Sequence, residues 1–208
     1  EIDKKAKNKA ALQKKFGLPV NPNVPIVAMV TRLVAHKGLD LVEFVANDLM
    51  KQNMQMIVLG TGDEKYEELF YRMQYYCPEK ISVKVDFDTS LASQIYAGAD
   101  FLLMPSQSEP CGLTQLIAMR YGTIPIVRET GGLFDTVPSL NVYTLEGRGF
   151  TFKLYNAHDM LGAIKRAIDF YQDKPKLKKI INNIMSYDCS WNEPVKQYLN
   201  LYKQVLSQ

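Results

Sequence analysis

From residue 26 onwards, short apolar segments alternate with segments whose apolar residues recur at helical spacing. The apolar segments predict five strands, at residues 26–30, 56–59, 81–85, 101–104 and 124–127. They contain few polar residues, which is typical of parallel strands buried on both faces. The segments between them predict helices at residues 38–50, 63–76, 91–96 and 113–120, and a short one after Gly132. This alternation predicts a doubly wound α/β domain with a parallel, Rossmann-like sheet.

The residues before the first strand are interpreted as a linker or arm, residues 1–22. A Lys-rich helix is predicted at residues 3–16, and it ends at Gly17. Its apolar residues are few, namely Ala10, Leu12 and Phe16. The Rossmann-like domain is then predicted to cover residues 23–187.

The last part of the chain adds helices of a different character. Asn156 is predicted to cap one helix, and Pro175 to begin the next. Residues 188–208 are predicted to form a C-terminal helix with an apolar stripe made of Val195, Tyr198, Leu199, Tyr202, Val205 and Leu206. That stripe is too broad for a helix with nothing to lie against. We therefore expect this helix to pack on another body, such as a second domain.

Charge and composition exclude several classes of protein. The 25 Lys and Arg residues nearly balance 22 Asp and Glu residues, and a net charge of +3 argues against a nucleic-acid binder that works by phosphate neutralisation. No apolar run approaches the ~20 residues that cross a bilayer, and the first residues resemble no signal peptide. The three cysteines, which are odd in number and widely spaced, are expected to be reduced thiols. These features predict a cytoplasmic protein that binds neither nucleic acid nor membrane.

The loops after the strands are the places to look for chemistry, because open parallel sheets bind ligands beyond the carboxyl ends of their strands. Arg32 and Lys37 follow the first strand, and such a pair of cations suits a diphosphate. Taken alone, they are better explained as two solvated side chains. After the fourth strand, Glu109 precedes Gly112, which opens a helix whose free amides would attract an anion. With the glycine turn at residues 129–133, three loops at one edge predict a phosphate site.

Other motifs indicate less. Asp86-Phe87-Asp88 is similar to a metal-binding Asp-x-Asp, but two carboxylates flanking a loop are usually solvated. Gly60-Thr61-Gly62 is followed by Lys65 where a dinucleotide fingerprint has glycine, which argues against a nicotinamide cofactor. His36 and His158 have no partner pattern for zinc or for a catalytic triad.

A family resemblance rests mainly on three segments after the fourth strand. After Pro105-Ser106 they read Glu109-Pro110-Cys111-Gly112-Leu113-Thr114-Gln115, Tyr121-Gly122-Thr123-Ile124-Pro125 and Thr130-Gly131-Gly132-Leu133. With Thr31-Arg32-Leu33 and Lys37-Gly38-Leu39-Asp40-Leu41, they closely resemble the bacterial glycogen synthase and starch synthase family. The resemblance extends from residue 8 to residue 191 and on into the tail helix, which is essentially the whole chain. It implies the carboxyl-terminal, nucleotide-sugar-binding half of a GT-B glycosyltransferase, whose amino-terminal half has no counterpart in these residues.

The resemblance implies roles for the matching residues. Arg32 and Lys37 would hold the diphosphate and stabilise the departing nucleoside diphosphate. Glu109 would lie beside the donor glucose and favour positive charge at the anomeric carbon, its alternative role being to complement a helix dipole. Phe87 aligns with an aromatic residue that stacks on adenine, although a core position explains a phenylalanine equally well. The donor would also contact Cys111, through its backbone amide, and Gly112, Leu113, Thr114, Gly131 and Gly132. No metal ion or other cofactor is expected.

The function implied by the resemblance is transfer of glucose from ADP-glucose to the non-reducing end of an α-1,4-glucan, with retention of configuration. Ile117 stands where sucrose-type and lipid-sugar transferases place a second glutamate, which argues for glucan synthesis. Two alternatives are another retaining GT-B glycosyltransferase and a nucleotide-sugar-binding module without turnover. Because GT-B chemistry takes place between two domains, this chain alone is expected to bind donor but not to make glucan. Its expected partners are the donor, the glucan acceptor and an amino-terminal domain.

Overall fold

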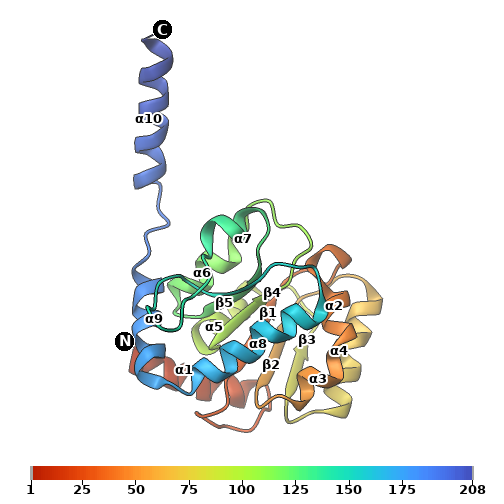
Figure 1. Cartoon of the computed structure of the whole chain (residues 1–208). Coiled ribbons are helices and arrows are strands. Elements are labelled where there is room, and N and C mark those ends of the chain that lie inside the picture. Colours follow the sequence, from red (N-terminus) through yellow and green to blue (C-terminus); the bar gives the residue numbers. More distant parts are fainter. Residues whose placement is uncertain (1, 208) are drawn as a thin grey trace.

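The computed structural model describes residues 2–207 and shows one parallel sheet flanked by helices (Figure 1). Its strands are β1 (Ile26–Val30), β2 (Gln55–Leu59), β3 (Ile81–Lys84), β4 (Phe101–Met104), β5 (Ile124–Arg128) and β6 (Phe150–Phe152). They lie in the order β3-β2-β1-β4-β5-β6, and every neighbouring pair is parallel. The predicted doubly wound, Rossmann-like α/β fold is confirmed.

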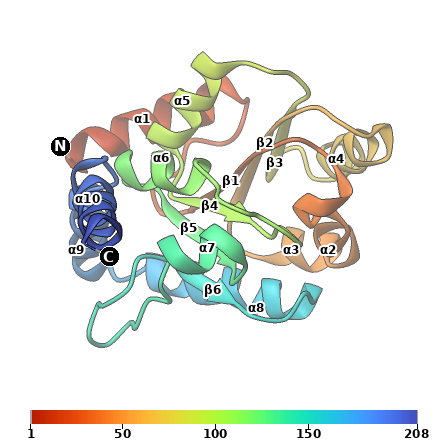
Figure 2. The same ribbon diagram turned by 90° about the horizontal axis from the view of Figure 1, so that it is seen from above.

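Helices cover both faces of the sheet (Figure 2). They are α1 (Ile2–Lys15), α2 (Leu39–Phe44), α3 (Ala46–Lys51), α4 (Glu64–Tyr76), α5 (Thr89–Gly98), α6 (Thr114–Arg120), α7 (Gly131–Thr136), α8 (Ala157–Tyr171), α9 (Lys174–Ser186) and α10 (Asn192–Leu206). α2, α3, α4, α8 and α9 pack on one face, α1 and α5 pack on the other, and α6 contributes Met119 to the first core and Ala118 to the second. The side chain of Asn156 caps α8 as predicted, and Asp173 caps α9 just before Pro175.

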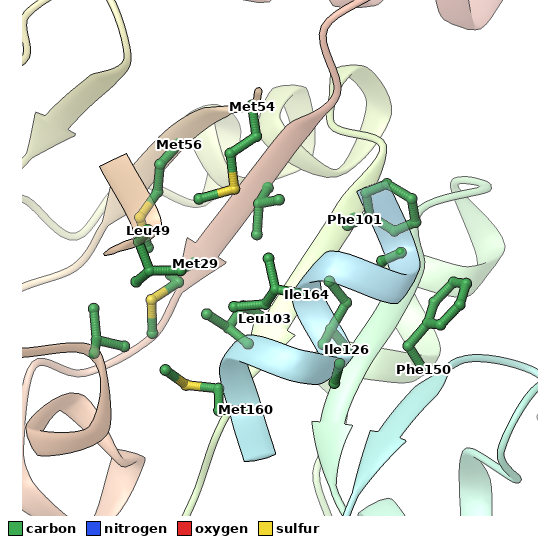
Figure 3. Packing of buried hydrophobic residues seen from close by; sticks show 14 of the residues in the cluster. Met29, Leu49, Met54, Met56, Phe101, Leu103, Ile126, Phe150, Met160 and Ile164 are labelled. Atoms are coloured by element: carbon green, nitrogen blue, oxygen red, sulfur yellow. The ribbon is translucent and has the colours of Figure 1, made fainter. Parts of the chain in front are cut away.

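The strands are buried because successive side chains enter different cores. Val27 and Met29 of β1 join the cluster that contains α8, whereas Ile26 and Ala28 join the cluster that contains α5. Figure 3 shows Met29 and strand residues beside it packed against α8, which contributes Met160 and Ile164. Each such side chain stabilises the fold by about 1.5–3 kcal/mol when fully buried, so the sheet forms a rigid support for the loops at its edges.

The first helix is packed more closely than its composition predicts. α1 lies along α5, and it buries Lys9 and Gln13 in addition to Leu12. The Lys9 ammonium pairs with Asp100 at 2.7 Å, and the Gln13 amide donates to Gln55 at 2.7 Å. The sequence analysis missed these anchors because long polar side chains are usually exposed. That residues 1–22 connect two domains stays a prediction.

α10 stands apart from the sheet and its helices (Figure 1). Val195, Tyr198 and Leu199 are exposed, and so are the apolar residues one and two turns further along. Within residues 2–207, no other element covers this stripe. The expectation that α10 packs on another body therefore stays a prediction.

Two local features differ from the sequence-based prediction. β6, of three residues, was missed because it is too short for a clear period of alternation. The helix predicted at residues 38–50 is divided at Val45, where the backbone leaves the helical region, into α2 and α3. No helix among residues 2–207 is both long enough and apolar enough to span a membrane.

Candidate functional site

The strand order reverses between β1 and β4, so the loops that follow these strands diverge and leave a crevice at the carboxyl edge of the sheet. A cavity of about 220 Å³ lies there. Its lining includes the ends of both strands and six of the predicted site residues, Arg32, Lys37, Glu109, Gly112, Leu113 and Thr114. The fold thus brings together two loops that are more than 60 residues apart in the sequence.

The loop after β1 carries the two cations. The side chain of Arg32 is exposed and makes no hydrogen bond or ion pair with any other described residue, while its carbonyl accepts a hydrogen bond from the backbone N–H of Val34 at 3.0 Å. Lys37 ends the 3-10 helix η1 (Ala35–Lys37). Gly38 follows in the left-handed region, with φ of +75°, and a Cβ there would overlap the carbonyl oxygen of Pro105. Glycine at this position therefore permits the Lys37 loop and the Glu109 loop to approach each other.

Glu109 and Lys37 form the polar centre of the cavity. The Lys37 ammonium lies 2.6 Å from Glu109 Oε2, and the two side chains are 17% and 11% exposed. Ser106 donates its hydroxyl to the same oxygen at 3.1 Å. The sequence predicted that both charged groups line one site, and the structure adds that they pair with each other.

The loop between β4 and α6 is held from several sides. The backbone N–H of Gln107 donates to the carbonyl of His36 at 2.9 Å, and Arg128, at the end of β5, donates to the carbonyls of Ser106 and Gln107. The Gln115 amide donates to the carbonyls of Cys111 and Gly112, at 3.2 and 2.9 Å. Ser106, Arg128 and Gln115 were not among the predicted site residues. For Arg128, a charge at the end of a buried strand was the available signal.

Gly131 and Gly132 pack directly beneath this loop. A Cβ on Gly131 would overlap the carbonyl oxygen of Glu109, and a Cβ on Gly132 would overlap that of Cys111. Gly132 also donates its backbone N–H to the Glu109 carbonyl at 3.0 Å. Neither glycine is among the residues that line the cavity, so the structure gives them a packing role, and their contact with the donor stays a prediction.

Phe87 and Cys111 lie at the surface. Phe87 is 84% exposed, just beyond β3, so the core position considered for it is wrong. An exposed aromatic ring at the carboxyl edge of the sheet is free to stack on a planar ligand. Cys111 is also exposed, and neither residue lines the cavity itself.

Both carboxylates of the Asp-x-Asp motif accept hydrogen bonds from nearby backbone N–H groups. Asp88 is the N-cap of α5 and accepts from the backbone N–H of Leu91, and Asp86 accepts from that of Phe87. Among residues 2–207, no three His, Cys, Asp or Glu side chains gather where they could hold a metal ion. The chemistry that the cavity itself offers is two cations, one carboxylate and the amides of the first turn of α6, a set that suits a phosphate group joined to a polyhydroxylated unit.

A hydrogen bond between a tyrosine and an aspartate joins two further segments at the carboxyl edge of the sheet. Tyr155 donates its hydroxyl to Asp40 Oδ1 at 2.5 Å. Burial and this hydrogen bond raise the pKa of Tyr155, so its hydroxyl stays protonated. The contact links the segment after β6 to α2, at the carboxyl edge of the sheet.

Comparisons with known proteins agree with this geometry. The glycogen synthase of Bacillus cereus (strain ATCC 10987 / NRS 248) is 53% identical over 202 residues, which are 97% of this chain and 42% of that protein. The glycogen synthase of Kosmotoga olearia is 49% identical over 99% of this chain and 43% of its own length. The chain therefore spans about 42% of the length of these curated relatives.

A solved structure extends the similarity to three dimensions. The catalytic domain of starch synthase IV from Arabidopsis thaliana, bound to ADP and acarbose, superposes with a TM-score of 0.87 and 35% identity. The match covers 98% of this chain and 43% of that one, and the resemblance to glycogen and starch synthases is confirmed. Residues 11–186, most of the chain, match the family described as glycosyl transferases group 1. The chain therefore belongs to the group 1 glycosyl transferases.

Proposed function

We propose that this chain forms the donor-binding part of a glycogen or starch synthase. In the longer protein, glucose would pass from ADP-glucose to the non-reducing end of an α-1,4-glucan with retention of configuration. The observation that carries the proposal is the cavity between β1 and β4, which Arg32, Lys37 and Glu109 line together and in which Lys37 pairs with Glu109. The identity to glycogen synthases and the likeness to a starch synthase bound to ADP support the choice of substrate.

Each group in the cavity has a task that follows from its charge. Arg32 offers a planar fork of donors and Lys37 a point charge, so together they neutralise a diphosphate and stabilise it as the glycosidic bond to the sugar breaks. The amides of residues 112–114 hold phosphate and sugar oxygens. Glu109 accepts hydrogen bonds from sugar hydroxyls, and its charge favours the positive charge that develops at the anomeric carbon.

The acceptor and the second wall of the cleft would come from the rest of the protein, since the chain spans about 42% of its relatives. Closure of a cleft excludes water and brings acceptor and donor to reacting distance, an effect worth several kcal/mol. This chain alone should therefore bind ADP-glucose without elongating glycogen.

The test is titration calorimetry of the chain with ADP-glucose, UDP-glucose and GDP-mannose, each with and without EDTA. We expect ADP-glucose to bind most tightly and EDTA to have no effect, because we propose that no metal ion takes part. Tightest binding of UDP-glucose or GDP-mannose would favour another retaining GT-B transferase. No binding of any donor would refute the proposal. Glycogen elongation by this chain alone, at the rate of an intact synthase, would refute the two-domain mechanism.

We also propose a cytoplasmic location. Cys77, Cys111 and Cys189 are free in the structure, and free thiols persist in a reducing compartment. Fractionation of cells that produce the protein tests this directly.

A further inference from the structure

The carboxylate of Glu109 is held through one of its two oxygens. Both of its contacts, with Lys37 and with Ser106, go to Oε2. Oε1 of Glu109 makes no hydrogen bond with any described residue. If it were also buried, it would be a buried oxygen without a partner, but among the described residues the one such side-chain atom is Oε1 of Gln115. Oε1 of Glu109 is therefore accessible. The carboxylate thus has one oxygen that the protein occupies and one that a ligand can use.

Ser106 is in turn fixed by Arg128. Ser106 is 1% exposed, and its carbonyl accepts a hydrogen bond from Arg128 Nε at 2.9 Å. Arg128 Nη2 donates to the next carbonyl, that of Gln107, at 2.5 Å. A guanidinium is planar, so two donors that engage consecutive carbonyls restrict the loop in both position and orientation.

Arg128 has firm support of its own. It is the last residue of β5, which is paired on both sides, with β4 and with β6, and its guanidinium lies 5.6 Å from the centroid of the Tyr155 ring. A continuous set of contacts therefore runs from the sheet through Arg128 to Ser106 and on to the Glu109 carboxylate.

We propose that Ser106 and Arg128 are positioning residues that aim Oε1 of Glu109 at the glucose unit of the donor, and so determine how well the sugar is recognised. The inference rests on the proposed function, in which Glu109 meets the sugar and Arg32 and Lys37 meet the diphosphate. Without the Ser106 hydroxyl, Lys37 alone orients the carboxylate, and one ion pair leaves it free to rotate. The loss then falls on the sugar contact, because the diphosphate contacts do not depend on that hydroxyl.

Ser106→Ala isolates this effect, because it removes the hydroxyl and keeps the carbonyl that Arg128 binds. We expect ADP-glucose to bind about tenfold more weakly, the loss of one charge-assisted hydrogen bond, while the dissociation constant of ADP changes by less than about twofold. Arg128→Lys keeps the charge but loses the planar fork that fixes the orientation of the two carbonyls, so it should move the ratio of the two constants in the same direction. Ser108→Ala is the matched control, since Ser108 is exposed on the same loop and its hydroxyl does not bond the Glu109 carboxylate, and it should leave the ratio unchanged.

A double-mutant cycle with Glu109→Gln separates positioning from a general loss of loop structure. If Ser106 acts through Glu109, Ser106→Ala should produce little further change in the ratio once the carboxylate is gone. The inference would be overturned if Ser106→Ala left the ratio of the two dissociation constants unchanged, or if it weakened the binding of ADP and of ADP-glucose equally. It would also be overturned if the effects of Ser106→Ala and Glu109→Gln on the ratio were fully additive. A wild-type chain that binds neither ligand would instead overturn the proposed function, so the two failures are distinguishable.

Discussion

The ion pair between Lys37 and Glu109 predicts that the two residues have opposite effects on ADP. ADP carries the diphosphate but no sugar, so it should use Lys37 without engaging Glu109. In the unliganded protein, Glu109 holds the Lys37 ammonium at 2.6 Å. Lys37→Met should therefore weaken ADP binding, whereas Glu109→Gln should strengthen it because it releases the lysine.

The size of each effect follows from the environment of the pair. A charge-assisted hydrogen bond from Lys37 to a phosphate is worth about 1.5–3 kcal/mol, which corresponds to about 10- to 150-fold in affinity. Exposed ion pairs contribute about 0.2–1 kcal/mol. With exposures of 17% and 11%, this pair should reach or exceed the upper end of that range. Glu109→Gln should then increase the affinity for ADP by about five- to tenfold.

Titration calorimetry of the wild type and both variants, at low and high salt, measures these effects. Salt should reduce the advantage of Glu109→Gln, because it screens the attraction between Lys37 and Glu109 that this variant removes. Circular dichroism verifies that each variant is folded. If Glu109→Gln weakened ADP as much as Lys37→Met, the glutamate would organise the lysine for binding, and the reasoning from competition would be refuted.

Further predictions concern other parts of the chain. Phe87→Ala should weaken the binding of ADP by about 1–3 kcal/mol, the scale of base stacking, whereas Phe87→Tyr should bind ADP as the wild type does. Equal affinities of the wild type and Phe87→Ala for ADP in calorimetry would exclude stacking. Burial lowers the pKa of Lys5 from 10.5 to about 8, so between these values the unfolded chain holds a proton that the folded chain has released. The free energy of unfolding should therefore rise with pH from about 8 towards 10.5, and denaturant melts of Lys5→Met should lack that part of the rise, unlike those of the exposed control Lys4→Met. Deletion of residues 188–208 should leave the thermal midpoint nearly unchanged and reduce self-association measured by analytical ultracentrifugation, because α10 exposes its apolar stripe; a drop of several degrees would show that α10 supports the domain.

Most of the fold was predictable because its strands are apolar and its helices are periodic. Val27 and Met29 enter one core, and Ile26 and Ala28 enter the other. Every residue of the segment is therefore apolar, a pattern that is typical of a strand buried on both faces. β6 was not predictable in this way. It has three residues and follows a long irregular segment, and its place in the sheet depends on pairing with β5.

The candidate site was predictable to the level of its loops. Lys37 and Glu109 both follow strands whose carboxyl ends meet at one edge, so their proximity follows from the topology. The contacts that support Glu109 did not follow from it. Arg128 donates to backbone carbonyls more than 20 residues away in the sequence. Every residue has a backbone carbonyl, so the sequence does not indicate which of them a distant side chain will bind.

The glycines of the site show why a motif alone leaves a residue's role open. Gly38 permits a close approach to Pro105, and Gly131 and Gly132 permit the same to Glu109 and Cys111. A methyl group at any of the three would push on the backbone of the loop that carries Glu109. Glycine is therefore required there by the packing of three loops, whether or not the donor touches it. Since that packing also sets the distance from Lys37 to Glu109, these glycines act on the chemistry of the cavity through the backbone.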